Sequence, residues 1–235
     1  MIIAANLKTN LTRKQTDDYL SKLEGCLEEH KLSQDVMVFP AASSLNKHSG
    51  QVVVGVQNAY AAKNGAYTGE IGLDHIEEFG IKTILIGHSE RRHVMGETQE
   101  MLAKKFDFYK ELGFKIVYCV GEPLEIRESS NEVMMDYLSA QYEGIDTEYE
   151  NLVIAYEPVW AIGTGLTPTL QDIENIHEEL KKKSSAPLLY GGSVKVANAK
   201  DILACGNVDG VLVGSAALNV DDFCMMCRYA QELEK

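Results

Sequence analysis

The chain has 235 residues, of which 45% are hydrophobic, and its 35 acidic against 22 basic side chains give a formal net charge of -13. This composition argues against disorder, and the negative charge argues against nucleic acid or an anionic membrane as a partner. No segment approaches the roughly 20 apolar residues that cross a bilayer, and the apolar run at the N-terminus is too short for a signal peptide. We therefore expect a soluble cytoplasmic protein, folded as a single domain over residues 1–235.

Short runs rich in Val, Ile and Leu recur along the chain and predict eight β-strands. Most runs are continuous rather than alternating, which is the pattern of parallel strands covered on both faces. The predicted strands are residues 2–6, 36–39, 52–57, 83–87, 115–120, 152–156, 187–190 and 208–213.

Helical patterns lie between these strands. Apolar stripes at helical spacing indicate helices packed on a core, and the three clearest are Tyr19, Leu20, Leu23 and Leu27; Met101, Leu102, Lys105, Phe106 and Tyr109; and Ile173, Ile176 and Leu180. Strand and helix alternating eight times predicts a single (β/α)8 barrel. Only 12 residues, 40–51, separate the second and third strands, so we expect a shortened second outer helix.

Five cysteines show no extracellular disulfide framework. Cys224 and Cys227 form a CxxC motif, yet they lie in an amphipathic terminal pattern where this spacing puts two small apolar groups on one helix face. No second cysteine pair or nearby histidine completes a metal site around that motif. We predict reduced thiols and no bound metal.

Polar and glycine-rich residues follow five of the predicted strands at their carboxyl ends. Chemistry in a (β/α)8 barrel collects at that face, so these residues are predicted to share one rim. They are Asn6-Leu7-Lys8, the segment GHSERR at 87–92, Glu157, Tyr190-Gly191-Gly192-Ser193 and Gly214-Ser215.

The segment AYEPVWAIGTGLT, residues 155–167, is the most informative of these ends. Its apolar strand delivers one carboxylate, Glu157, into a loop. Pro158 fixes the exit of the chain, while Gly163 and Gly165 let the loop bend or present N–H groups. A carboxylate at a strand end is more often a helix cap or an ion-pair partner, so this segment alone does not establish catalysis.

Taken in order, the motifs NLK, GHSERR with the GE at 96–97, AYEPVWAIGTGLT, YGGS and LVGSAAL resemble the triosephosphate isomerase family, from the first strand to the terminal helix. The resemblance implies a TIM barrel and a homodimeric, cofactor-free enzyme of glycolysis and gluconeogenesis. Such an enzyme interconverts dihydroxyacetone phosphate and D-glyceraldehyde 3-phosphate by proton transfer through an enediolate.

The resemblance also implies catalytic roles. Glu157 would be the base, and His88, as a neutral imidazole, would donate a hydrogen bond to the substrate oxygens. Lys8, reached through Asn6, would place a cation where negative charge grows. Glu97 resembles a further carboxylate that positions Lys8 and His88, with a helix-capping acid as the alternative. The remaining histidines are expected at the surface: His30, His48, His75, His93 and His177.

The phosphate-binding end is predicted to consist of backbone N–H groups, because helix N-termini and glycine-rich turns favour anions. The residues are Gly163 in the loop after the sixth strand, Gly192 and Ser193 after the seventh, and Gly214 and Ser215 after the eighth. The family usually has a second glycine where this chain has Ser215. Serine keeps the N–H but adopts fewer backbone conformations.

Residues 158–168 are expected to form a lid over this site. The lid begins at Pro158, with a first hinge at Val159 and Trp160 and a second hinge at Leu166, Thr167 and Pro168. Tyr190 and Ser193 are expected to hydrogen-bond the closed lid.

Residues 57–72, with GAYTGE at their centre, form an unusually long connection. By the same resemblance, this loop reaches into a partner subunit of a symmetric dimer. Thr68 at its tip would support Asn6 and Lys8 across the interface.

Two alternatives stay open. One is another phosphosugar-binding barrel enzyme, which would reuse the phosphate loops with a different acid–base pair. The other is a catalytically silent barrel that serves as a scaffold. The joint presence of Lys8, His88 and Glu157 disfavours both.

Overall fold

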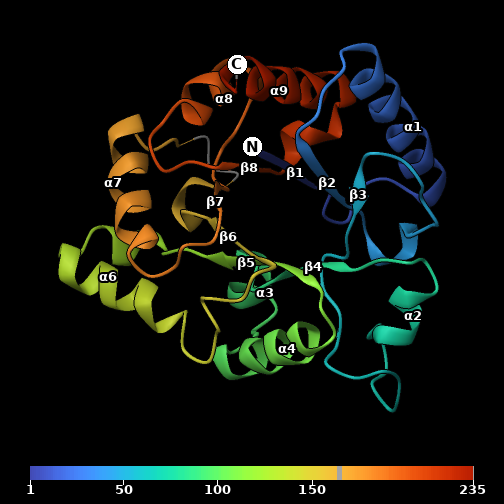
Figure 1. The fold of residues 1–235 in the computed structure, drawn as a ribbon. Coiled ribbons are helices and arrows are strands. Elements are labelled where there is room, and N and C mark those ends of the chain that lie inside the picture. Colours follow the sequence, from blue (N-terminus) through green and yellow to red (C-terminus); the bar gives the residue numbers. More distant parts are fainter. Residues whose placement is uncertain (163–165, 235) are drawn as a thin grey trace.

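The computed structural model describes residues 1–162 and 166–234. Within them, eight parallel strands form one sheet in the order β3-β2-β1-β8-β7-β6-β5-β4, with helices around it (Figure 1). The strands are β1 (Ile2–Asn6), β2 (Asp35–Phe39), β3 (Val53–Val54), β4 (Thr83–Ile86), β5 (Lys115–Val120), β6 (Leu152–Tyr156), β7 (Leu188–Tyr190) and β8 (Gly210–Val213). A parallel bridge between Val56 and Ile84 joins the two ends of the sheet, which confirms the predicted (β/α)8 barrel.

Most of the outer layer is α-helical. The α-helices are α1 (Arg13–Glu29), α2 (Leu73–Glu77), α3 (Ser89–His93), α4 (Gln99–Glu111), α5 (Leu124–Arg127), α6 (Asn131–Ala140), α7 (Leu170–Lys181), α8 (Val196–Leu203) and α9 (Val220–Leu233). Three short 3-10 helices add to them: η1 (Ala42–Ser44), η2 (Val159–Ala161) and η3 (Ser215–Leu218). In the described part of the chain, no helix is long and apolar enough to span a bilayer.

The connection from β2 to β3 is the least regular part of the barrel. It holds only η1, so the predicted shortening of the second outer helix is confirmed. The third strand is also shorter than predicted, because the chain changes partner after Val54. Gly55 N donates to Val38 O on one side, whereas Val56 N donates to Thr83 O on the other, both at 2.9 Å.

Side chains along each strand alternate between the barrel interior and the layer beneath the helices. The interior cluster consists of Ile2, Ala4, Met37, Phe39, Leu85, Val117, Cys119, Val153, Ala155, Leu189 and Leu212. In β1 the intervening Ile3 and Ala5 belong to the larger cluster outside. Because the side-chain period is two, the interior rows of β1 and β6 continue to Asn6 and Glu157 at the carboxyl ends.

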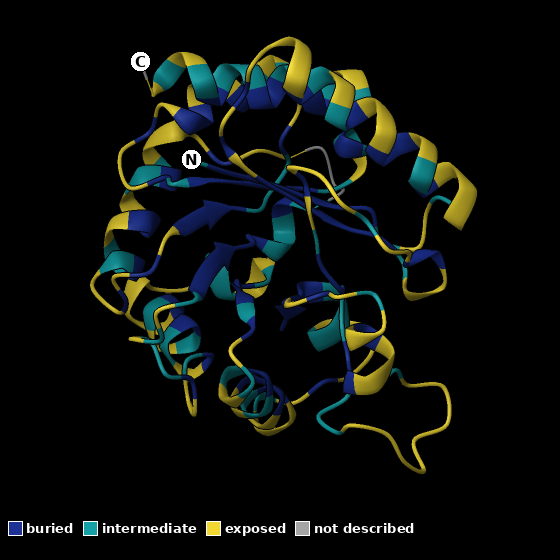
Figure 2. Cartoon of the chain, turned by 45° about the vertical axis from the view of Figure 1, so that its right-hand side comes forward, coloured by how far each residue is buried: buried dark blue, intermediate teal, exposed yellow. Residues whose placement is uncertain are grey.

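The outer helices bury one face and expose the other (Figure 2). The predicted stripes of α1 and α7 are buried as expected. In α4 the buried residues are Leu102, Lys105, Phe106 and Tyr109, whereas Met101 is 45% exposed. The prediction for Met101 is wrong because this residue lies about 90° around the helix from the centre of the stripe.

The predicted surface position of His177 is also wrong. Its side chain is fully buried on the inner face of α7, beside the rings of Tyr156 and Tyr190. Nδ1 lies 2.9 Å from Asn207 O, and burial lowers the pKa of His177 to about 4. The histidine follows Ile176 in the apolar stripe, so it lies on the covered face of the helix.

The predicted reduced state of the thiols is wrong for one pair. Cys26 of α1 and Cys224 of α9 form a disulfide, with Cα atoms 6.4 Å apart. They are separated by 198 residues and meet because the first and last helices pack side by side (Figure 1). Cys119, Cys205 and Cys227 are free and buried.

Candidate active site

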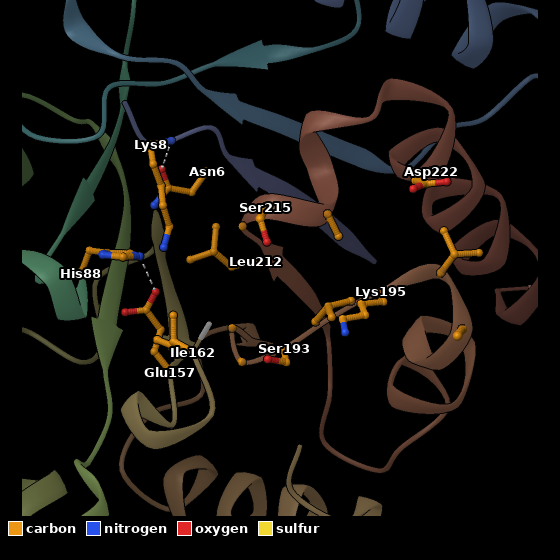
Figure 3. Close-up of a pocket in the computed structure, with 17 residues that line it drawn as sticks. Asn6, Lys8, His88, Glu157, Ile162, Ser193, Lys195, Leu212, Ser215 and Asp222 are labelled. Carbon is orange, nitrogen blue, oxygen red and sulfur yellow. Dashed lines mark hydrogen bonds and ion pairs between the residues drawn. The ribbon is translucent and has the colours of Figure 1, made fainter. Parts of the chain in front are cut away.

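A cavity of about 890 Å³ opens at the carboxyl ends of the strands (Figure 3). It brings together predicted site residues that are far apart in the sequence. These are Asn6, Lys8, His88, Glu157, Gly192, Ser193, Gly214 and Ser215. The predicted shared rim therefore exists for these residues, while Gly163 lies outside the described ranges.

Glu157 continues the interior row of β6 into the cavity and is only 2% exposed. Its Oε1 lies 3.1 Å from His88 Nε2, and its Oε2 accepts a hydrogen bond from Ser89 N at 2.9 Å. A Cβ on Gly191 would lie 2.9 Å from the Glu157 Cγ, so a glycine at that position leaves room for the carboxylate. Both oxygens of Glu157 are thus held by donors.

His88 follows β4 and caps the N-terminus of α3. Its Nδ1 accepts a hydrogen bond from Glu90 N at 3.2 Å. A ring nitrogen that accepts a hydrogen bond carries no proton, so the proton of the neutral ring belongs on Nε2. Nε2–H then donates to Glu157 and faces the cavity (Figure 3).

Lys8 is held in place from both its backbone and its side chain. Its backbone is left-handed, with φ of 52°, and its N–H donates to Asn6 Oδ1 at 3.0 Å. Gln57 Nε2 donates to Lys8 O at 2.7 Å. The ammonium group is paired with Glu90, whose Oε1 lies 2.5 Å from Nζ.

Glu90 is a site residue that our sequence reasoning missed. One of its oxygens pairs with Lys8, and the other lies 3.7 Å from His88 Nδ1. It is the second residue after His88 in the GHSERR segment, so its position within that motif was the available signal.

Glu97 lies elsewhere. It is buried, and its Oε1 accepts from Arg91 Nε at 2.7 Å and from Lys105 Nζ. Lys105 in turn donates to Asn58 Oδ1 at 2.6 Å, at the root of the long loop. Glu90, and not Glu97, therefore occupies the place beside Lys8 that we predicted for Glu97. The capping alternative is not observed either, because the side chain that caps α4 is Thr98.

The residues whose backbone N–H groups we predict to bind phosphate also line the cavity, and Ser193 and Ser215 are labelled in Figure 3. Gly192 and Ser193 follow β7, and Gly214 and Ser215 open η3. Ser215 is not among the described non-glycine residues with positive φ, so its backbone adopts a conformation that is open to serine. A serine is therefore accommodated where the family usually has a glycine.

The first hinge of the predicted lid is bound to Glu122, a second residue that our sequence reasoning missed. Glu122 Oε1 accepts from Trp160 Nε1 and from Tyr156 Oη, both at 3.0 Å, and Glu122 O accepts from Val159 N at 3.0 Å. The Glu122 side chain is fully buried, and this burial raises the pKa of its carboxyl. The sequence signal that could have identified Glu122 is a glutamate two residues after the end of the fifth strand.

The lid also contacts the phosphate side of the cavity. Ser193 Oγ donates to Ala161 O at 2.5 Å. Away from this cavity, Arg127 lies over the Trp160 ring at 5.6 Å. Tyr190 Oη, which we predicted to bond the lid, has no hydrogen-bond partner among residues 1–162 and 166–234. At the second hinge, Leu166 and Thr167 are exposed and Pro168 is buried.

Among the described residues, one group of three has ligand atoms close enough to share a metal ion. It consists of Cys26, His30 and Cys224, and it lies outside this cavity. The cavity itself is lined by one imidazole, two lysines, Lys8 and Lys195, and the carboxylates of Glu157 and Asp222, which is an arrangement for acid–base chemistry on an anionic substrate.

Comparison with known proteins identifies relatives over almost the whole chain. The family model described as triosephosphate isomerase matches residues 1–230. A triosephosphate isomerase of Sulfurimonas denitrificans is 69% identical over 235 residues, covering 100% of this chain and 98% of the relative. Those of a Sulfurovum species and a Nitratiruptor species are 53% and 50% identical, covering 96% and 99% of this chain and 99% and 100% of the relatives.

Proposed function

The chain belongs to the triosephosphate isomerase family of enzymes, and from that premise we propose how its own residues interconvert dihydroxyacetone phosphate and D-glyceraldehyde 3-phosphate. Glu157 takes a proton from the carbon beside the substrate carbonyl and returns it to the neighbouring carbon. To do so, its carboxylate gives up the hydrogen bond from His88 or from Ser89 and contacts the reacting C–H group instead. The contact between Glu157 and His88 at the mouth of one cavity is the observation that carries this proposal.

His88 acts as the electrophile. Its Nε2–H turns from Glu157 to the substrate carbonyl and then to the enediolate oxygens, while the Glu90 N–H keeps the proton off Nδ1. A neutral ring suits this role, because its Nε2–H donates a hydrogen bond to the substrate oxygens while the ring itself carries no positive charge. Lys8 stabilises the negative charge that grows on the same oxygens, with Asn6 and Glu90 as positioning residues.

The substrate phosphate binds to the N–H groups of Gly192, Ser193, Gly214 and Ser215, with Gly163 added from the lid. Such local donors are needed because the chain carries a net charge of -13 and its overall field repels a dianion. The lid, 158–168, closes over the bound phosphate and excludes water from the enediolate.

A coupled assay with glyceraldehyde 3-phosphate tests these roles. Glu157→Gln keeps the shape of the side chain but removes the base, so we expect turnover to fall by about 10³-fold or more, with KM changed only a few-fold. Glu132→Gln, on the exposed face of α6, is the matched control. A wild-type protein without turnover would refute the function, and unchanged turnover in Glu157→Gln would refute the assignment of the base.

We also propose that the enzyme works as a homodimer in the cytoplasm, in glycolysis and gluconeogenesis, without a cofactor. Residues 63–70 of the long loop are exposed and stand away from the barrel (Figure 2). A second cavity of about 340 Å³ adjoins Lys8 and is lined partly by Gly69, Glu70 and Met95. An exposed loop tip beside a recess at the active site supports a dimer in which each Thr68 enters the partner.

A further inference from the structure

A second group of chemically versatile side chains lies on the outside of the barrel, where α1 and α9 pack together (Figure 1). Cys26 belongs to α1, Cys224 belongs to α9, and His30 follows α1 directly. One ligand atom from each, the two Sγ atoms and a ring nitrogen, lie within 4.8 Å of one another. None of these residues lines the active-site cavity, so the proposed isomerase chemistry leaves them without a role.

The local geometry has two features of a metal site. Cys26 and His30 are four residues apart, and His30 N donates to Cys26 O at 3.1 Å, so one helical turn carries both side chains on the same face. Cys224 approaches from the neighbouring helix. Thiolates and imidazoles are the ligands that zinc prefers, and in a tetrahedral site the ligand atoms lie about 3.5–4 Å apart. All three ligand atoms lie within 4.8 Å of one another, and the two sulfur atoms can separate to this spacing only after the S–S bond is broken.

We propose that, once the disulfide is reduced, Cys26, Cys224 and His30 bind a zinc ion. Reduction needs a dithiol reductant of the class that keeps intracellular thiols reduced. It supplies two electrons and two protons, the S–S bond breaks, two thiols form, and the reductant becomes a disulfide. Zinc then displaces both thiol protons and forms two Zn–S bonds, while a neutral ring nitrogen of His30 supplies the third bond.

The disulfide and the metal therefore exclude each other, because both use the same two sulfur atoms. Either one joins the first long helix to the last. His30 is exposed and Cys26 is half-buried, so solvent can reach the site and water can take the fourth zinc position. Because bound zinc replaces protons, its affinity should fall as the pH is lowered.

Cys227 provides a matched control within the same helix. It lies three residues after Cys224 but is fully buried and outside the group. Burial also raises the pKa of its thiol to about 12, which opposes the thiolate that a metal requires. Cys227→Ser should therefore leave zinc binding unchanged.

The experiment compares reduced and oxidised protein freed of metal by a chelator. Reduced wild type and Cys227→Ser are expected to bind one zinc per chain and, with Co²⁺ as a probe, to show thiolate-to-cobalt charge-transfer absorption. Oxidised wild type is expected to bind none. Cys26→Ser and His30→Ala should weaken zinc binding at least about tenfold. Isomerase activity, unchanged in each variant, reports that the protein is folded.

A second readout does not depend on substituting the nearly buried Cys224. In reduced wild type, zinc should protect Cys26 and Cys224 from alkylation, as mass spectrometry of the labelled peptides would detect. The proposal is overturned if reduced wild type binds zinc no better than Cys26→Ser, if oxidised protein binds it equally well, or if zinc leaves the alkylation of both cysteines unchanged.

Discussion

Two buried titratable side chains lie behind the active-site rim, and they make stability depend on pH in opposite ways. His177 is held neutral beside the rings of Tyr156 and Tyr190. Glu122 is a buried carboxyl that binds the first hinge of the lid. Each one resists becoming charged, because burial removes the hydration of the charged form.

His177→Asn should make the protein less sensitive to acid. Burial lowers the pKa of His177 from 6.5 to about 4, so between these values the unfolded chain binds a proton that the folded chain refuses. Stability is therefore complete above pH 6.5 and falls as the pH drops toward 4, by about 3 kcal/mol in total. Asparagine can still donate to Asn207 O but does not titrate. Urea unfolding at several pH values should show a steeper acid loss for wild type, and parallel curves would contradict the assignment.

Glu122→Gln should show the opposite trend. Burial raises the pKa of the Glu122 carboxyl above its ordinary 4.5. As the pH rises from 4.5 toward the raised pKa of the folded carboxyl, the unfolded chain releases its proton first. The wild type therefore loses stability until the folded carboxyl also ionises. The neutral glutamine avoids this loss. We expect the stability of Glu122→Gln relative to wild type to increase from pH 4.5 upward, and a gap independent of pH in the same unfolding experiment would count against a raised pKa.

At the scale of elements, hydrogen bonds join the described part of the lid to the barrel at two places. Its first hinge contacts Glu122 at the end of β5, and Ala161 at the end of η2 contacts Ser193 after β7. Glu122 and Ser193 follow strands of the packed barrel, whereas the lid changes position during turnover in our proposal. Each such bond therefore affects the balance between lid positions.

Ser193→Ala tests the bond on the phosphate side. One neutral hydrogen bond contributes about 0.5–1.5 kcal/mol, so we expect kcat/KM to fall by up to about tenfold. Ser139→Ala is the matched control, because Ser139 Oγ donates to Met135 O at 2.6 Å within α6 and neither residue lines the cavity. Steady-state kinetics should separate the two variants. Equal kcat/KM values in the two variants would show that the Ser193 hydrogen bond does not affect the lid.

The strands and the polar residues after them could be predicted from the sequence, because continuous apolar runs mark covered strands and their carboxyl ends share one rim. Contacts between side chains could not. The pair Lys8 and Glu90 joins residues 82 apart, and the pair Cys26 and Cys224 joins residues 198 apart. Both depend on how loops turn and helices pack, which local periodicity does not encode. Glu122 was missed for the same reason, since its partners come from other segments.

At the scale of the whole molecule, the surface around the long loop exposes several large apolar side chains. Tyr67 stacks on Tyr60 with ring centroids 4.0 Å apart, yet Tyr67 remains 43% exposed. Val94 and Met95 are 72% and 66% exposed. Large apolar side chains exposed beside a loop are typical of a surface that another protein covers, and a second copy of the chain is the partner that we propose.

Thr68→Arg tests that dimer directly. In a free monomer, an arginine at an exposed loop tip costs almost nothing, whereas in a dimer it would place a bulky charge inside the interface. We therefore expect the dissociation constant of the dimer to rise at least about tenfold, which corresponds to about 1.4 kcal/mol. Ser185→Arg, at a position that is also exposed, on the connection before β7, is the control.

Light scattering and sedimentation over a range of concentrations would measure this shift, and activity after dilution would report whether each active site needs its partner. If Thr68 supports Asn6 and Lys8 across the interface, diluted Thr68→Arg should lose activity in step with its dissociation, while Ser185→Arg behaves as wild type. A wild type that stays monomeric at all concentrations would refute the dimer. A Thr68→Arg protein that dimerises normally would show that the interface lies elsewhere, and that the recess beside Lys8 is not filled by the loop of a second chain.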